Sequence, residues 1–238
     1  QDYAVMSGEG MFKPAKVPAN VPIELAMSTF GLTGLTAYFG LLEVGRPKEG
    51  ETVLVSGAAG ATGSIVAQIA RVKGCRAIGI AGGKEKVDWL KNEAKIADVI
   101  DYKSEDVGKR VRELCPKGVD IFFDNVGGEQ LDIALANLAM YGRIVLCGAI
   151  SQYESATPVG PKNYMNLISR RGRMEGFLVS DHMKNAGKAI AEMAGWVREG
   201  KIVDRVDVQN GLENAPKTLN RLFTGQNIGK QLLKIADA

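Results

Sequence analysis

The chain has 238 residues, of which 45% are hydrophobic and 24% are charged, and its formal net charge is +3. These values are typical of a globular domain with a substantial core, and a small charge without a basic stripe excludes a nucleic-acid-binding protein. With no apolar run of about 18 residues, no signal peptide and three isolated cysteines, we expect a cytoplasmic protein without a membrane partner.

Strand and helix patterns alternate along most of the chain. Residues 23–42 predict two helices that meet at residues 31–34. After them we predict strands at 53–55, 75–80, 98–102, 119–123, 143–147, 174–179, 202–208 and 231–235. Further helices are predicted after Gly63 and at 84–91, 107–114, 131–140, 166–170, 183–199 and 212–223. This alternation predicts a Rossmann-type α/β fold, a doubly wound parallel sheet with its ligand across the carboxyl ends of the strands.

The stretch from residue 52 to residue 84 carries the clearest functional motif. An apolar strand is followed by small residues with the spacing A-x-G-x-x-G, Ala58 to Gly63, and then by an amphipathic helix. Small residues allow a tight turn and a close approach of the backbone to a pyrophosphate, and the helix N-terminus offers free N–H groups. A purely structural strand-to-helix turn is the alternative, but the position between strand and helix favours a dinucleotide. The residues expected at the phosphates are Ala59, Gly60, Ala61, Thr62 and Gly63.

The end of the second predicted strand bears on the choice of dinucleotide. An NAD-binding unit usually carries an acid there, about 20 residues after the glycines, to hold the ribose 2′-hydroxyl. This sequence has A-G-G-K at 81–84, which leaves room for a phosphate, and Lys84 or Lys86 supplies a positive charge. We therefore expect NADP(H) as the cofactor, although a solvated pair of lysines on the next helix is the alternative.

The chain resembles the zinc-independent medium-chain reductases, in the leukotriene/prostaglandin reductase and alkenal double-bond reductase branch. The similarity covers nearly the whole chain, and its blocks include GLTAYFG (34–40), SGAAGATG (56–63), DNVGG (124–128), GRIVLCGAISQY (142–153), GFLVSD (176–181) and GQNIGK (225–230). Two local departures are Leu32-Thr33 in place of Met-Pro, and residues 93–96 in place of a Leu-Gly turn.

Members of this family are about 100 residues longer at the N-terminus, where a GroES-like catalytic domain begins. The resemblance therefore implies that most of that domain is absent here. It divides the chain into a linker or remnant of the catalytic domain (1–22), an NADP-binding Rossmann domain (23–209) and a C-terminal segment that returns toward the catalytic domain (210–238).

The resemblance also implies roles for individual residues. Thr36 approaches the nicotinamide, Asn125 contacts the cofactor ribose, and Tyr153 faces the substrate carbonyl as the catalytic residue. The strand around Phe177 pairs with its copy in a homodimer. The remaining implied cofactor contacts are Gly82, Gly83, Lys86 and Tyr102 around the 2′-phosphate and adenosine, Cys147 and Ala149 along the nicotinamide, and Asn227 from the C-terminal segment.

Each of these roles has a simpler alternative. Tyr153 is also consistent with an ordinary tyrosine in a surface loop, and Cys147 with a residue that only packs in a strand. Asn125 suits a turn residue with an unusual backbone angle before two glycines.

Neither a metal site nor a serine-hydrolase triad is predicted. His182 is the only histidine, no partner motif accompanies it, and we expect it to be solvated at a helix start. Zinc-dependent relatives carry a cysteine where this chain has Phe30.

The sequence therefore predicts an NADPH-dependent reductase of α,β-unsaturated ketones or aldehydes, with hydride transfer to the β-carbon and an enolate stabilised by Tyr153. Two alternatives stay open. One is a quinone oxidoreductase of the same superfamily, and the other is a catalytically incomplete chain that binds NADPH.

Overall fold

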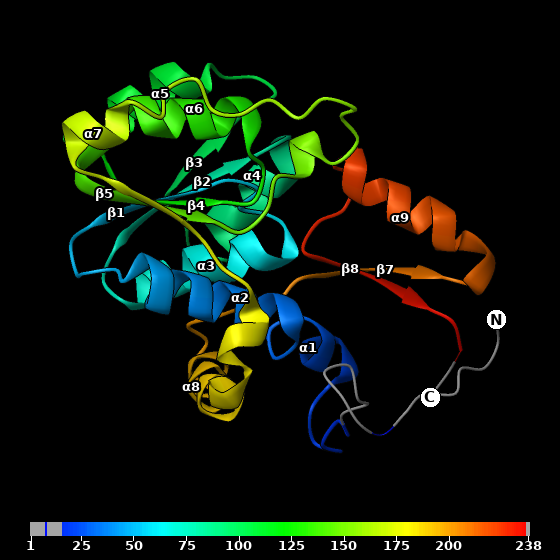
Figure 1. Ribbon diagram of the computed structural model, residues 1–238. Helices are drawn as coiled ribbons and strands as arrows, with labels where there is room; N and C mark the ends of the chain where they lie inside the picture. The colour runs from blue at the N-terminus through cyan, green and yellow to red at the C-terminus, as the bar shows by residue number, and fades with distance from the viewer. Residues whose placement is uncertain (1–7, 9–15, 237–238) are drawn as a thin grey trace.

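A six-stranded parallel sheet forms the centre of the molecule (Figure 1). The computed structural model describes residue 8 and residues 16–236. The strands lie in the order β3-β2-β1-β4-β5-β6, and every neighbouring pair is parallel. Their bounds are β1 Thr52–Val55, β2 Arg76–Ala81, β3 Asp98–Asp101, β4 Val119–Asp124, β5 Leu138–Leu146 and β6 Arg173–Gly176. The predicted Rossmann-type fold is confirmed.

Both faces of the sheet are buried, which explains why its strands are apolar almost throughout. Side chains of a strand alternate between faces. Val53 and Val55 belong to one core and Leu54 to the other, and Phe123 and Phe122 divide in the same way.

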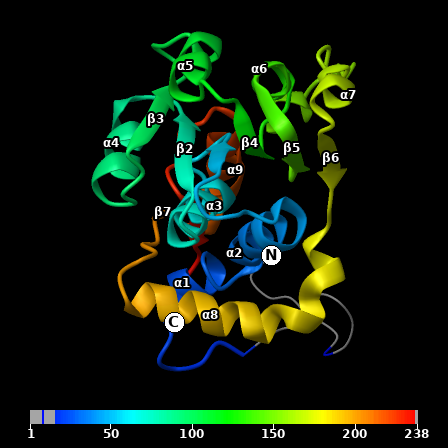
Figure 2. The ribbon, with the colours of Figure 1, turned by 90° about the vertical axis from the view of Figure 1, so that its left-hand side faces the viewer.

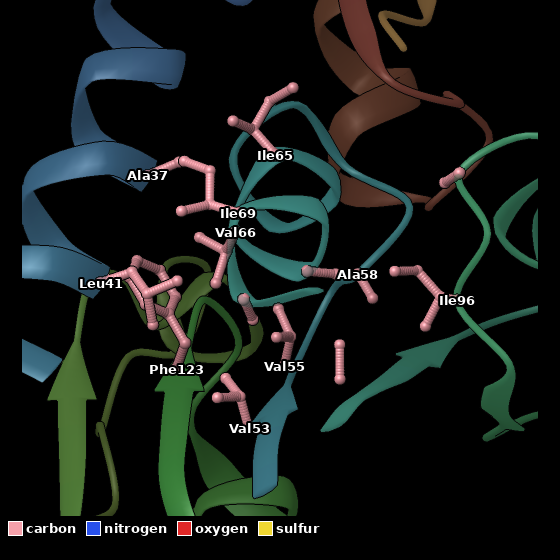
Figure 3. Close-up of a cluster of buried hydrophobic side chains, with 14 of the residues drawn as sticks. Ala37, Leu41, Val53, Val55, Ala58, Ile65, Val66, Ile69, Ile96 and Phe123 are labelled. Carbon is pink, nitrogen blue, oxygen red and sulfur yellow. The ribbon is translucent and has the colours of Figure 1, made fainter. Parts of the chain in front are cut away.

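Helices cover the two faces in separate layers, which Figure 2 shows from the side. One layer contains α5 (Val107–Leu114), α6 (Gly128–Ala136) and α7 (Asn166–Arg170), and the other contains α2 (Leu32–Phe39), α3 (Ala61–Val72) and α4 (Lys84–Asn92). Helix α8 (Ala186–Arg198) packs on α2, farther from the sheet. In Figure 3, Leu41 lies beside the strand residue Phe123, and Val66 and Ile69 of α3 lie next to this pair. The short helix α1 (Ile23–Met27) precedes α2.

Tertiary contacts move several boundaries away from the sequence prediction. The helix predicted at 131–140 ends at Ala136, because the Asn137 carbonyl accepts from Val119 N–H at 2.8 Å and β5 begins at the next residue. The strand predicted at 174–179 stops at Gly176. After it Phe177 turns into the core, where its ring centroid lies 6.4 Å from that of Phe123.

The strand predicted at 202–208 begins later, as β7 (Val206–Asn210). The buried Gln68 side chain takes the place of a strand partner at Val203. Its Oε1 accepts from Val203 N at 2.8 Å and its Nε2 donates to Val203 O at 3.0 Å. Ser28 and Thr29 also donate their hydroxyls to the Asp204 carboxylate, each at 2.7 Å. Side chains therefore fix residues 203–204 where the sequence pattern alone indicates a strand.

The C-terminal part forms a small unit beside the main sheet (Figure 1). Strand β7 pairs in parallel with β8 (Lys230–Lys234), and α9 (Ala215–Phe223) packs against β8. Arg221 of α9 joins them, because it donates to the Asp207 carboxylate at 2.6 Å and to Gln231 Oε1 at 3.0 Å. The 3₁₀ helices η3 (Val179–Asn185) and η4 (Leu212–Asn214) lie ahead of α8 and α9, and η1 (Gly40–Gly45) is a π-helix after α2.

The predicted division into segments 1–22, 23–209 and 210–238 stays a prediction, and most of the first segment lies outside the described residues. No helix in the described part of the chain is both long enough and apolar enough to cross a bilayer.

Candidate functional site

A cavity lies where the carboxyl ends of β1, β2 and β4 meet the C-terminal unit. Its volume is about 670 Å³, which is within the usual range for a small-molecule site. It lies at the reversal of strand order between β1 and β4, the place where open α/β sheets bind their ligands. Ten of the predicted site residues line it: Ala59, Gly60, Ala61, Thr62, Gly63, Gly82, Lys86, Tyr102, Asn125 and Asn227.

The glycine turn forms the floor of this cavity. Gly57 adopts a left-handed backbone (φ 58°), and its carbonyl accepts from Gly60 N at 2.9 Å. A Cβ added to Gly63 would lie 2.3 Å from the Gly57 carbonyl oxygen, so the first turn of α3 packs directly on the loop. Only a residue without a side chain permits this approach.

The N-terminus of α3 points N–H groups at the cavity. Gly60 is the N-cap and supplies no side-chain acceptor. Among the described residues, none accepts from the N–H groups of Ala61, Thr62 and Gly63. Three unsatisfied donors and the positive end of the helix dipole make this position suitable for an anionic group.

Gly82 and Tyr102 form the cavity wall at the end of β2. A Cβ on Gly82 would lie 2.6 Å from the Tyr102 ring, so glycine is needed for the ring to lie there. Gly83 has φ 94° and does not line the cavity, and its N–H donates to Asp101 Oδ1 at 2.9 Å. Although burial favours the neutral acid, the N–H groups of Gly83 and Lys103 hold the pKa of Asp101 below its usual value.

Two lysines bring positive charge to the cavity. Lys86 Nζ donates to the Gly225 carbonyl at 2.7 Å, and burial followed by the charge of Lys103 lowers its pKa. Lys230, at the start of β8, also lines the cavity, and burial lowers its pKa. Lysines at these places favour an anionic ligand.

The turn after β4 is held by a buried polar network. Asp124 Oδ1 accepts from Ser56 Oγ at 2.9 Å and from the N–H groups of Val126 and Gly127 at 3.0 and 2.9 Å. Asn125 donates its side-chain amide to the Ser56 carbonyl at 2.7 Å. Burial raises the pKa of Asp124 although these hydrogen bonds act against it. The network joins the ends of β1 and β4 and places Asn125 at the cavity.

The loop after β5 lies beside the cavity. Tyr153 is 63% exposed, and its Oη accepts from Ala149 N–H at 3.1 Å. Burial, and then the charge of Asp124, raises the pKa of the Cys147 thiol to about 12, so it stays neutral. Tyr153, Ala149 and Cys147 do not line the cavity, whereas Ile150 and Ser151 of the same loop do.

Two further predicted residues have their polar groups occupied. Thr36 donates its hydroxyl to the Leu32 carbonyl at 2.7 Å and does not line the cavity, while Thr33 of the same helix does. Asn227 lines it and donates its amide to the Gly229 carbonyl at 3.1 Å.

His182 is partly buried and stacks on Phe39 at a centroid distance of 5.1 Å. In the described ranges, residue 8 and residues 16–236, no three His, Cys, Asp or Glu side chains are grouped to hold a metal ion.

The sequence analysis did not assign several lining residues. They come from the start of α6, the end of α9, the start of β8 and the chain between α9 and β8, and include Gly127, Glu129, Gln130, Leu222, Phe223, Thr224, Gly225, Gly229, Lys230 and Gln231. Two of the quoted sequence blocks, DNVGG and GQNIGK, contain some of them and were the available signal.

Comparison with known proteins identifies a family and several relatives of this chain. A family model described as zinc-binding dehydrogenase matches residues 61–195. A putative NADP-dependent oxidoreductase of Bacillus subtilis, YfmJ, is 46% identical over 91% of this chain, and the NADP(+)-dependent 2-alkenal reductase of Nicotiana tabacum is 44% identical over 91%. The crystal structure of CurA from Vibrio vulnificus in complex with NADPH superposes with a TM-score of 0.91 and 40% identity, over 100% of this chain and 72% of that one.

The chain is shorter than these relatives. It spans 65% of the Bacillus subtilis protein and 64% of the tobacco reductase. The cavity described above lies in the part that they share with this chain.

Proposed function

The chain belongs to the zinc-binding dehydrogenase family, in the branch of NADP-dependent alkenal and prostaglandin reductases. From this membership we propose that it binds NADP(H) in the cavity between the carboxyl ends of the strands and the C-terminal unit. We propose further that the protein reduces the activated C=C bond of α,β-unsaturated ketones or aldehydes by hydride transfer to the β-carbon. The observation that carries the proposal is the glycine turn, which presents three unsatisfied N–H groups at the N-terminus of α3.

The residues present fit a dinucleotide. The N–H groups of Ala61, Thr62 and Gly63 suit a pyrophosphate, and the missing side chain at Gly63 lets the helix approach the turn. The amide of Asn125 is fixed by Ser56 at the adjoining edge, where it is suited to a ribose hydroxyl.

Phosphorylated dinucleotide is favoured by the charges around Gly82. Lys86 offers an ammonium group there, and the Asp101 carboxylate already accepts the N–H groups of Gly83 and Lys103 through Oδ1. Tyr102 provides an exposed ring against which adenine can stack. Lys230 adds a second positive charge on the opposite wall.

Bound NADPH supplies the hydride. The chain's own contribution to the chemistry is Tyr153, whose Oη accepts from Ala149 N–H and keeps its own proton available for donation. A hydrogen bond from Tyr153 to the substrate carbonyl stabilises the negative charge that develops on that oxygen. The neutral thiol of Cys147 transfers no proton in this scheme.

We propose that this reaction needs no zinc, because a phenol donor at the carbonyl replaces a Lewis acid. Phe30, which stands where zinc-dependent relatives carry a cysteine, packs against the hydrophobic core. We also propose a homodimer formed through the edge of the sheet at β6, where the 68% exposed Leu178 follows the strand.

A cofactor-binding titration and substrate assays together test the proposal. NADPH binding is measured by titration, and NADPH oxidation is followed with an enone, an enal and a quinone, both in this chain and in a form of the relatives' length. Enone and enal reduction is the expected result. Turnover with the quinone alone would favour a quinone oxidoreductase, and binding without turnover in both forms would leave only the cofactor-binding role.

A further inference from the structure

One wall of the cavity comes from the C-terminal chain between α9 and β8, and its first attachment is part of the backbone. Gly229 N donates to the Ala59 carbonyl at 2.7 Å, and Gly229 forms a parallel bridge with Gly60. Gly229 has φ 69°, and a Cβ there would lie 2.0 Å from the Arg205 carbonyl oxygen. This attachment therefore involves main-chain groups alone.

The second attachment is a side chain. Lys86 of α4 donates to the carbonyl of Gly225, the residue with φ 63° that follows α9, at an Nζ–O distance of 2.7 Å. The two residues are 139 positions apart in the sequence. Among the described residues no salt bridge includes Lys86, so the partly buried ammonium has a neutral oxygen as its hydrogen-bond acceptor.

An ammonium group carries three donors. One of them is used at Gly225, and the side chain lies at the place proposed for the 2′-phosphate. A phosphate bound there would hold the flexible lysine stem, and the entropy cost of ordering that stem would be met by the stronger charge-assisted bond. The bond to Gly225 then forms at little further entropic cost.

We propose that Lys86 is a latch operated by the 2′-phosphate. The phosphate fixes the ammonium, the ammonium fixes Gly225, and the wall 224–228 becomes ordered over the cofactor. An unphosphorylated dinucleotide leaves the Lys86–Gly225 bond as it is in the free protein. The latch rests on the proposed function, because it requires a phosphorylated dinucleotide in this cavity, and it adds positive cooperativity between phosphate binding and closure of the wall.

Hydrogen exchange of the amides in residues 222–230 tests the latch directly. The free protein is compared with the protein saturated by NADPH and by NADH, each at a concentration set by its own titration. We expect NADPH to slow exchange in this segment by about tenfold more than NADH does, the size of effect that one charge-assisted hydrogen bond produces. The probe 2′-AMP, which has the phosphate without the nicotinamide half, is expected to reproduce the protection, whereas 5′-AMP is not.

The matched variants are Lys86→Met and Lys84→Met in the same helix. Lys84 pairs with Asp88 on the surface, its side chain is 86% exposed, and it does not line the cavity. The difference between NADPH and NADH protection should disappear in Lys86→Met at saturation and remain in Lys84→Met. Thermal unfolding checks that both variants are folded.

The possible results distinguish failure of the latch from failure of the proposed function. If NADPH binds the wild-type chain more tightly than NADH but both protect residues 222–230 equally, the latch is wrong and the proposed function stands. A difference between NADPH and NADH protection that persists in Lys86→Met also overturns the latch. If the titration detects no NADPH binding, both the latch and the proposed function are wrong.

Discussion

A hydrogen bond to the hydroxyl oxygen holds Tyr153 in place, whereas its ring is not buried. The ring is largely exposed, while Oη accepts from Ala149 N–H and lies against Gly148, where an added Cβ would be 2.9 Å away. This arrangement fixes the direction of the phenol without burying the ring.

Replacing Tyr153 by phenylalanine should therefore affect chemistry more than cofactor binding. In a form that reduces enones, Tyr153→Phe is expected to lower turnover by about 100-fold, the usual effect of removing one oxyanion donor. The NADPH dissociation constant should stay nearly unchanged, because Tyr153 does not line the cavity. Steady-state kinetics and a binding titration measure both, with the exposed Tyr164→Phe as the control. A large loss of NADPH affinity would move Tyr153 into the cofactor site.

Gly63 is a residue whose missing side chain decides a contact. A methyl group there meets the Gly57 carbonyl oxygen at 2.3 Å, which is impossible without moving α3 away from the turn. Gly63→Ala is expected to lower the free energy of unfolding by about 1–3 kcal/mol and to weaken NADPH binding.

Gly195 in α8 provides the control for this substitution. A Cβ at Gly195 meets nothing within 4 Å, and alanine is favoured over glycine in a helix by about 1 kcal/mol. Gly195→Ala should therefore leave stability equal or higher. Urea unfolding of both variants makes the comparison, and equal effects would show that packing of α3 on the glycine turn is not the cause.

At the scale of elements, α9 and the β7–β8 pair are joined by the Arg221–Asp207 ion pair. The Asp207 side chain is only 11% exposed. Burial favours the neutral acid, but the Arg221 guanidinium and the Gln209 amide outweigh it and lower the pKa of Asp207. This pair fixes the C-terminal unit that supplies one wall of the cavity.

The lowered pKa of Asp207 determines how its contribution to stability changes with pH. Because the folded pKa is below the unfolded value of about 4, the ionised carboxylate stabilises the folded protein above about pH 4. The contribution is lost as pH falls through the folded pKa. Asp207→Asn should lower the free energy of unfolding by about 2 kcal/mol near neutral pH, and the difference from wild type should shrink below about pH 4. Urea unfolding across this range measures it, and a difference that does not change with pH would contradict the assignment.

At the scale of the whole molecule, the edge strand β6 is where we propose that a second copy adds to the sheet. Phe177 points inward, since a Cβ on Gly40 would lie 2.4 Å from its ring, so Leu178 is the apolar side chain offered to a partner. An exposed edge strand also presents unpaired N–H and C=O groups for pairing.

Leu178→Lys should therefore weaken a dimer formed at β6. Burying an unpaired charge at the contact is expected to raise the dimer dissociation constant by about tenfold or more. Sedimentation analysis over a range of concentrations measures the shift. Ile235→Lys, at another exposed apolar position, is the control. Equal behaviour of the two variants would remove β6 from the interface.

The sequence by itself determined the features that depend on neighbours along the chain. Apolar strands alternating with helices fix a parallel α/β sheet, because both faces must be covered. The small residues from Ala58 to Gly63 fix the glycine turn, because a side chain at Gly63 would collide with the Gly57 carbonyl. Asn137 and Gly176 show the limit of the method, since the ends of α6 and β6 depend on contacts with other elements.

Only the tertiary structure decided what closes the cavity. The bond from Lys86 to Gly225 joins residues 139 positions apart, and Gln68 takes the place of a strand partner 135 positions away at Val203. Such contacts leave no period or spacing in the sequence, because they arise from the way the elements pack in space. The family resemblance implied Asn227 at the cofactor, but the rest of the C-terminal wall and the position of Tyr153 outside the cavity lining could be found only once the chain was folded.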